Sequence, residues 1–364
     1  MYRYILFFIF ATFIVIAQIV LLSKMRSGTF WNRDVCDNKE APVVISIVGD
    51  LLIGSGRTWQ QIVKDDYGPA IMGDYFDVLK QSDLVFANFE GIISQGGEPR
   101  FKNLPAQFSL RTDPTIIRFL KHFDNIVLSF ANNHSADFGY DAIRETIDTL
   151  EKTKINYVGI GRNRQEALAS RVVEISGVRV AFIAFTDLLP KEYYADDMHT
   201  GIAELTPENL RAAIALAKQS ADFVIVSLHT AKDISTPFSF WPDSHQKLFY
   251  RSAIDYGADV VVGQHPHGLQ WVERYNGKLI FYSLGLFLYN PSVSRRYKST
   301  DLLFRATQFK GGGVLTLEIC RDGGYSFDLK PTRVTDHKQK LVVVPASLST
   351  ELFIRLITLQ LFDF

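Results

Sequence analysis

Cysteine, unbalanced charge and low-complexity sequence are all scarce in this chain of 364 residues. The two cysteines, Cys36 and Cys320, show no CxxC spacing, and the sequence leaves open whether they pair, so we expect two inert thiols. Lysine plus arginine equals aspartate plus glutamate at 39 each, so nothing indicates a nucleic-acid partner. We find neither repeats nor biased tracts. Because 47% of the residues are hydrophobic, the chain can bury a large core.

One long hydrophobic run is present, at the N-terminus. Residues 4–22 are apolar except for Thr12 and Gln18, and about 19 residues are enough to span a bilayer. A cleaved signal peptide would have a shorter apolar core and a small-residue cleavage site. Ser23-Lys24-Met25-Arg26 follows the run instead. We therefore predict an uncleaved membrane anchor at residues 1–23 and a polar linker at residues 24–42.

The most informative segment is VVVGQHPHGLQ, which carries His265 and His267. The three valines before Gly263 predict a strand buried on both faces. Pro266 fixes its own φ and restricts the residue before it, so the loop that holds the two histidines should be stiff. Two imidazoles at the end of a buried strand suit a divalent metal. The alternative is a surface loop that happens to carry two histidines.

Four other apolar runs also end in residues that can bind a metal. Open α/β sheets bind ligands beyond the carboxyl ends of their strands, where side chains from several strands converge. A single acid or amide after a strand is usually a turn residue or a helix cap. Five such endings together favour a metal centre. Besides the two histidines above, they supply Asp50, Asn88, Glu90, Asn133, His134, Asp137 and His229.

The apolar spacing and turn residues also predict the main elements. Helices are expected at residues 140–152, 207–219 and 243–256, and strands near 43–49, 84–88, 172–175, 179–185, 222–228 and 259–262. Hairpin turns are expected at Ser176-Gly177, Asn276-Gly277 and Asp322-Gly323. Residues 92–112 contain glycine and proline and are expected to form a loop.

The order of these motifs resembles a known family. The series VGD, ANFE, ANNHSADFG, a strand-terminal histidine, GADVVVGQHPHGLQ and KLIFYSLGLF is similar to the bacterial capsule-synthesis proteins called CapA or PgsA, over roughly residues 43–290. Those proteins are linked to poly-γ-glutamate capsules, and their domain is related to the calcineurin-like metallophosphoesterases. The resemblance implies an α/β fold, a four-layer α-β-β-α sandwich of two facing sheets with helices outside. We place this domain at residues 43–335 and a C-terminal extension at residues 336–364.

The resemblance also implies roles for the residues at the strand ends. The metal ligands would be Asp50, Glu90, Asn133, His229, His265 and His267. These would bind one or two divalent ions, Mn, Zn, Fe or Mg. His134 would act as the general acid, because the ordinary pKa of histidine lies near neutral. Asp137 would orient His134, or would only stabilise its loop.

Three further residues are candidates for binding substrate. Asn88 lies at the end of the second strand, and Arg57 and Arg100 offer bidentate forks for a phosphate or a carboxylate. For both arginines a solvated surface role is the alternative.

The chain departs from the family pattern at several positions. Leu52 replaces the histidine of the D-x-H motif, which puts one metal position in doubt. His229 is followed by Thr-Ala-Lys-Asp rather than by a W-G-x-E run, Gln264 stands where another histidine is common, and Leu286 replaces an asparagine. These changes leave the main ligands in place and alter the rim of the site.

Two classes of function remain open. The first is a metal-dependent hydrolase that acts on a phosphoester or on an amide of a glutamate polymer. The second is a non-catalytic scaffold that binds capsule-synthase subunits or the polyanionic polymer. Arg3 before the anchor and Lys24, Arg26 and Arg33 after it lean toward a cytoplasmic domain. The family resemblance implies the opposite, a single-pass protein of the cell membrane with an extracytoplasmic C-terminal domain, and we predict the latter.

Overall fold

The computed structural model describes residues 41–54, 68–100, 109–232, 241–289, 311–337 and 340–345. Residues 1–40, which include the predicted anchor and all but two residues of the predicted linker, and residues 346–364 lie outside the described residues. Within the described part, no helix is both long enough and apolar enough to cross a membrane.

The first sheet is built around β1, whose apolar, β-branched residues suit a strand covered on both faces. β1 runs in parallel with β2 and β15 and antiparallel to β16, and the parallel pairing continues from β2 to β5 and β6. β15 (Leu286–Tyr289) pairs with β1 beside this path. In order across the sheet, the remaining strands are β18 (Lys340–Pro345), β17 (Tyr325–His337), β16 (Gly311–Ile319), β1 (Val43–Leu52), β2 (Leu84–Phe89), β5 (Ile126–Ser129) and β6 (Asn156–Val158).

The second sheet has a parallel centre and an antiparallel strand at each edge. β9, β11, β12 and β14 are parallel neighbours, and β8 and β13 join them through hairpins. Both hairpin turns lie at the predicted positions, with positive φ at Ser176-Gly177 and at Asn276-Gly277. The order is β13 (Val272–Tyr275), β14 (Lys278–Phe281), β12 (Val260–Gln264), β11 (Phe223–His229), β9 (Val178–Thr186) and β8 (Arg171–Ile175).

The longer helices follow the predicted spacing. α6 (Gly139–Thr153) buries Ile143, Ile147 and Leu150 on one face. α8 (Pro207–Ser220) begins at an N-capping threonine, and α9 (Ser244–Asp255) begins with a capping box. The short helices are α3 (Gly68–Met72), α4 (Tyr75–Lys80), α5 (Ile117–Leu120) and α7 (Arg164–Leu168).

The remaining short elements lie in connections between the larger ones. The predicted loop 92–112 contains the short strands β3 (Ile92–Ile93) and β4 (Arg111–Thr112), which pair in parallel. β7 (Ile160–Gly161) pairs with β10 (Gly201–Ile202), and two 3-10 turns are η2 (Pro114–Ile116) and η3 (Lys191–Tyr193).

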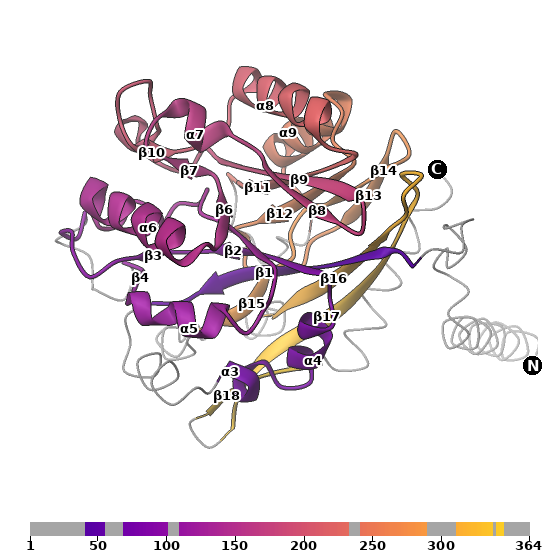
Figure 1. The fold of residues 1–364 in the computed structure, drawn as a ribbon, viewed down its shortest axis with the longest axis horizontal. Coiled ribbons are helices and arrows are strands. Elements are labelled where there is room, and N and C mark those ends of the chain that lie inside the picture. The colour runs from indigo at the N-terminus through magenta and orange to yellow at the C-terminus, as the bar shows by residue number, and fades with distance from the viewer. Residues whose placement is uncertain are drawn as a thin grey trace, which may run out of the picture.

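The two sheets face one another, with α8 and α9 outside the second sheet and α3, α4 and α5 on the side of the first (Figure 1). The main core joins the sheets: Phe86 of β2 stacks on Phe182 of β9 with ring centroids 5.2 Å apart, and both side chains are fully buried. A second core lies between the second sheet and the α8–α9 pair. The α/β class predicted from the sequence is confirmed.

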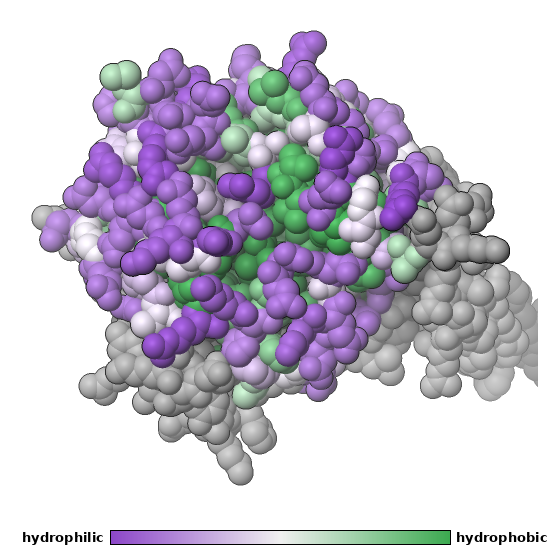
Figure 2. All heavy atoms as spheres, in the orientation of Figure 1, coloured by the Kyte–Doolittle hydropathy of each residue, from purple (hydrophilic) through white to green (hydrophobic). Residues whose placement is uncertain are grey.

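The described surface on the face drawn in Figure 2 is mostly hydrophilic, with hydrophobic side chains gathered in a strip across its middle. Partly buried residues such as Val173 and Tyr325 pack against the core between the sheets.

Cys320, beside the turn between β16 and β17, is disulfide-bonded, and its partner lies outside the described residues. The expectation of two inert thiols is therefore wrong for Cys320.

Candidate metal centre

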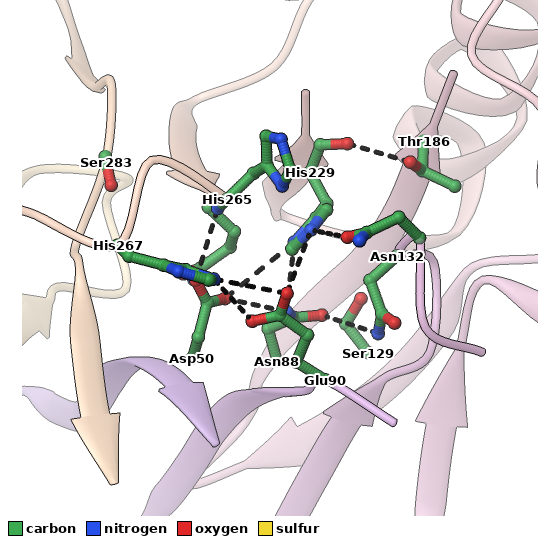
Figure 3. A network of polar contacts seen from close by, with 12 residues as sticks. Asp50, Asn88, Glu90, Ser129, Asn132, Thr186, His229, His265, His267 and Ser283 are labelled. Atoms are coloured by element: carbon green, nitrogen blue, oxygen red, sulfur yellow. Dashed lines mark hydrogen bonds and ion pairs between the residues drawn. The ribbon is translucent and has the colours of Figure 1, made fainter. Parts of the chain in front are cut away.

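The parallel strands of both sheets end at one place. β1 delivers Asp50, β11 delivers His229, and the turn after β12 delivers His265 and His267. Glu90 directly follows β2. Because parallel strands point their carboxyl ends to the same edge, these side chains converge between the two sheets, as Figure 3 shows.

Asp50 is fully buried and is held by two hydrogen bonds. The amide of Asn88 donates from Nδ2 to Asp50 Oδ1 at 2.7 Å, and the backbone N–H of His265 donates to Oδ2 at 3.2 Å. The aspartate is thus fixed from β2 on one side and from the turn after β12 on the other.

Glu90 occupies the middle of the cluster and is also fully buried. Its Oε2 lies 3.1 Å from His267 Nε2. Its Oε1 lies 3.8 Å from His229 Nε2 and 3.8 Å from His134 Nε2. One carboxylate therefore faces histidines from three separate segments.

Among the described residues, two sets of three side chains could each hold an ion. In each set the ligand atoms lie within 4.8 Å of one another, and Glu90 belongs to both. A shared carboxylate is suited to bridging two metal ions. Leu52 replaces the histidine of the D-x-H motif, but the remaining side chains still offer ligands for two metal positions. The sets are Glu90, His229 and His265, and Asp50, Glu90 and His267.

The ring of His229 is clamped at both nitrogens. Nε2 lies 2.8 Å from Asn133 Oδ1, and Nδ1 lies 3.1 Å from the amide nitrogen of Asn88. Thr186 at the end of β9 donates its hydroxyl to the His229 carbonyl at 2.8 Å. All six residues predicted as ligands are thus brought together, and their coordination of a metal stays a prediction.

The backbone at His265 and His267 adopts positive φ, 96° and 58°. A residue before proline usually adopts extended backbone, so this conformation of His265 is unusual. The hydrogen bond from the His265 N–H to Asp50 fixes the turn in this shape. Strained backbone of this kind is typical of functional sites, where the surroundings must stabilise it.

The residues fit a divalent cation. Asp50 and Glu90 are two carboxylates with no exposed surface, and burying negative charge without compensation is unfavourable. His265 Nδ1 is buried and has no hydrogen-bond partner among the described residues. Carboxylate oxygens with imidazole nitrogens form a donor set typical of zinc, manganese or iron sites.

Burial and the charges of neighbouring groups shift the pKa values of these side chains. Burial, with the charge of Glu90, raises the pKa of Asp50 to about 8. Burial would also raise the pKa of Glu90, but His267, by its charge and hydrogen bond, and His229 hold it below its usual value. Burial lowers the pKa of His229 well below its ordinary value, and burial with the charge of His267 lowers that of His265 to about 4. Both pKa shifts favour the neutral imidazole, the form in which histidine binds a metal.

His134 lies beside the cluster with its ring held by Asp137. His134 Nδ1 is 2.7 Å from Asp137 Oδ2, and the Leu110 N–H donates to the same oxygen at 2.8 Å. Burial would lower the pKa of His134, but Asp137 and Glu90 raise it above its usual value. The ring is therefore suited to donating a proton, although its predicted role as the general acid is untested.

The predicted substrate-binding residues lie in three different settings. Asn88 is fully buried and orients Asp50 and His229, and its contact with substrate stays a prediction. Arg100 is partly buried, with its guanidinium carbon 5.1 Å from the centroid of the Tyr193 ring. Arg57 lies outside the described residues.

Sequence reasoning gave no role to two buried amides of the centre. Asn132 donates to the Phe89 carbonyl at 2.8 Å and accepts from the His134 N–H at 3.1 Å, which ties the β5 loop to β2. Gln264 can donate to Asp50 Oδ1 at 3.0 Å in the amide orientation that satisfies both of its side-chain atoms. Asn132 directly precedes Asn133, and Gln264 directly precedes His265. This position next to a predicted ligand is the sequence signal that could have identified them.

Two curated capsule proteins are similar to most of this chain. PGA biosynthesis protein CapA of Bacillus subtilis (strain 168) is 27% identical over 329 residues, which cover 90% of this chain and 84% of that protein. Capsule biosynthesis protein CapA of Bacillus anthracis is 29% identical over 308 residues, or 84% of this chain and 73% of that protein.

Two solved structures from Thermus thermophilus also match. A hypothetical protein has a TM-score of 0.42 at 15% identity, covering 79% of this chain and 99% of its own. A 5′-nucleotidase precursor has a TM-score of 0.42 at 13% identity, covering 87% of this chain and 58% of its own. The family described as bacterial capsule synthesis protein PGA_cap matches residues 44–291. The chain therefore belongs to the PGA_cap family of bacterial capsule synthesis proteins.

Proposed function

We propose that this chain is a membrane-anchored component of poly-γ-glutamate capsule synthesis or export, with a metal centre that hydrolyses a phosphoester or amide bond. Membership of the family and the names of the Bacillus relatives support the capsule assignment. The observation that carries the hydrolase assignment is the pair of ligand sets that share Glu90 at the ends of parallel strands.

The chemistry follows from the donors around Glu90. The ligand candidates would hold a divalent metal, which would supply an activated water. His134, oriented by Asp137, would donate a proton to the leaving oxygen or nitrogen. This division of labour, with the order of the ligands along the strands, supports a relation to the calcineurin-like metallophosphoesterases.

We expect the substrate to carry negative charge. A capsule polymer of glutamate carries a carboxylate on every residue, and a phosphoester carries charge at the reacting group. Arg100 is joined to the loop of His134, because its backbone N–H donates to the Asp137 carbonyl at 2.7 Å. A guanidinium at this place is suited to binding a carboxylate or phosphate close to the proton donor.

Placement outside the cytoplasm is part of the proposal. Residues 4–22 would cross the membrane once and leave the domain on the outer side. Cys320 supports this orientation because its sulfur is disulfide-bonded, and disulfides persist mainly in oxidising compartments.

The decisive experiment measures metal and hydrolysis on the full chain purified gently in mild detergent. We expect up to two divalent ions per chain, together with hydrolysis of a phosphodiester reporter or of poly-γ-glutamate. His265→Ala should lose metal and activity together. His199→Ala, which changes an exposed histidine outside the centre, is the matched control and should retain both.

A scaffold would give a different result in cells. If a strain that lacks the protein makes no capsule, and His265→Ala restores capsule as fully as the wild type does, the hydrolase assignment fails and a scaffolding role replaces it. Wild-type protein without bound metal above background, even after incubation with Mn²⁺ or Zn²⁺, would also reject the metal centre.

A further inference from the structure

A second histidine–aspartate pair lies next to the centre and outside its ligand sets. His245 Nε2, in the first turn of α9, lies 2.5 Å from Asp187 Oδ2. Asp187 directly follows β9, and its Oδ1 accepts a hydrogen bond from the Thr230 hydroxyl at 2.5 Å. Both members of the pair keep 17% of their side-chain surface exposed, so they lie neither in the core nor on the open surface.

Thr230 connects this pair to a ligand candidate. It directly follows His229 and is fully buried. On the other side, Thr186 pairs with His229 in the register of β9 and β11 and donates its hydroxyl to the His229 carbonyl. The end of β11 is therefore fixed to the end of β9 by two consecutive residues, and Asp187 extends this attachment to the start of α9.

We propose that Asp187 and His245 are positioning residues for one of the two metal positions, the one formed by Glu90, His229 and His265. The inference rests on the proposed metal centre and adds to it that the two positions are unequal. Asp187 holds the strand end that carries His229, and His245 holds Asp187. The position formed by Asp50, Glu90 and His267 lacks this support among the described residues, because Asn88 and the turn after β12 hold Asp50 instead.

Groups that orient metal ligands usually change affinity by about 10–100-fold when removed. Asp187→Asn keeps the size of the side chain and an acceptor for Thr230 while removing the negative charge. Thr230→Val keeps the shape of the side chain and removes the hydroxyl. We expect each change to weaken one metal equivalent by about 10–100-fold and to leave the other within about twofold of wild type.

The experiment titrates metal-free, full-length protein in mild detergent with Zn²⁺ alone by calorimetry, for the wild type and each variant. Thr230→Ser, which retains a hydroxyl, should restore the affinity lost in Thr230→Val. Asp196→Asn is the matched control, because Asp196 pairs with the exposed His199 on a separate turn. Melting temperatures of the metal-free proteins identify any variant whose fold, rather than its metal affinity, has changed.

Cobalt provides a readout that a purely structural role would not alter. Co²⁺ absorption reports the geometry of its ligands, so Asp187→Asn and Thr230→Val should shift the bands of one of two bound ions. The inference is wrong if both variants keep both wild-type metal affinities, or if they lose affinity equally at both positions. Either result would leave the proposed metal centre intact. Wild-type protein that binds no Zn²⁺ would overturn both.

Discussion

At the scale of single residues, the centre keeps charges in places that are unfavourable without a cation. Asp50 has no exposed surface, and its pKa is raised from the usual 3.8 to about 8 by burial and by Glu90. An acid whose pKa is higher in the folded chain takes up a proton on folding. Its contribution therefore destabilises the metal-free protein progressively as the pH rises from about 4 to about 8.

Replacing this carboxyl should make the metal-free protein more stable while impairing the site. Asp50→Asn has nothing to titrate, so the decline in stability between about pH 5 and about pH 8 should be smaller in the variant. We expect its melting temperature in chelator at about pH 8 to exceed that of wild type by about 4 °C or more, as about 2 kcal/mol would give in a domain of this size. Melting curves at both pH values, followed by metal titration, test this, and parallel pH profiles would contradict it.

His134 gives a complementary prediction, because its ring faces Glu90 at 3.8 Å without belonging to either ligand set. His134→Ala should retain both metal equivalents and lower turnover by about 10²–10⁴-fold, the usual contribution of a general acid. Steady-state rates alongside metal analysis separate the two effects, with His199→Ala as a control. Loss of metal in His134→Ala would show that His134 is a ligand rather than a proton donor.

At the scale of elements, tight backbone packing fixes where the ligands lie. Gly263 of β12 precedes His265 by two residues and lies against the backbone of the strand-end segment after β14. A Cβ atom at Gly263 would lie 1.9 Å from the Tyr282 carbonyl oxygen and 2.5 Å from the Tyr250 hydroxyl. A glycine in a buried strand here permits the close approach on which the turn of His265 depends.

Gly263→Ala should therefore destabilise the fold by about 2–4 kcal/mol and also weaken metal binding. Gly277→Ala is the matched control: Gly277 lies in a hairpin turn at φ 77°, and a Cβ atom added there would meet no other atom within 4 Å. That change should cost about 1–2 kcal/mol, the usual penalty for a left-handed alanine, without affecting metal. Chemical denaturation and metal titration of both variants provide the comparison, and equal effects would contradict it.

Much of this element-level arrangement could be predicted from the sequence. Continuous β-branched runs marked the buried strands, Asn-Gly and Ser-Gly marked two hairpins, and strand-end polar residues marked the centre. The contact of His245 with Asp187 could not be predicted, because 58 residues separate them and neither lies in a recognisable motif. The positive φ of His265 could not be predicted either. A residue before proline usually adopts extended backbone, and the hydrogen bond from the His265 N–H to Asp50 depends on a residue far away in the sequence.

At the scale of the whole molecule, the centre joins two sheets that also share an apolar core. Asp50 and Glu90 come from the first sheet, while His229, His265 and His267 come from the second. Metal bound between them would stabilise the folded chain in proportion to its affinity. Chelation should therefore lower the stability of the entire domain as well as its activity.

The proposed orientation gives a prediction for the intact chain. Reporter fusions at the C-terminus should be active outside the cytoplasm, and protein purified without reductant should show no reactive thiol at Cys320 after denaturation. Cys320→Ser should lower the melting temperature, because a disulfide restricts the unfolded chain and typically contributes about 2–4 kcal/mol. A reporter active only inside the cell would reject the orientation.

The ligands also lie far apart along the chain, and this separation governs when the centre can exist. Asp50 and His265 are 215 residues apart, yet the backbone of one contacts the side chain of the other. A growing chain thus exposes its two acids long before the histidines of the second sheet are made. Such long-range pairing makes assembly slow and places it late in folding. If this centre binds metal, all of its ligands are therefore in place only after the two sheets have come together.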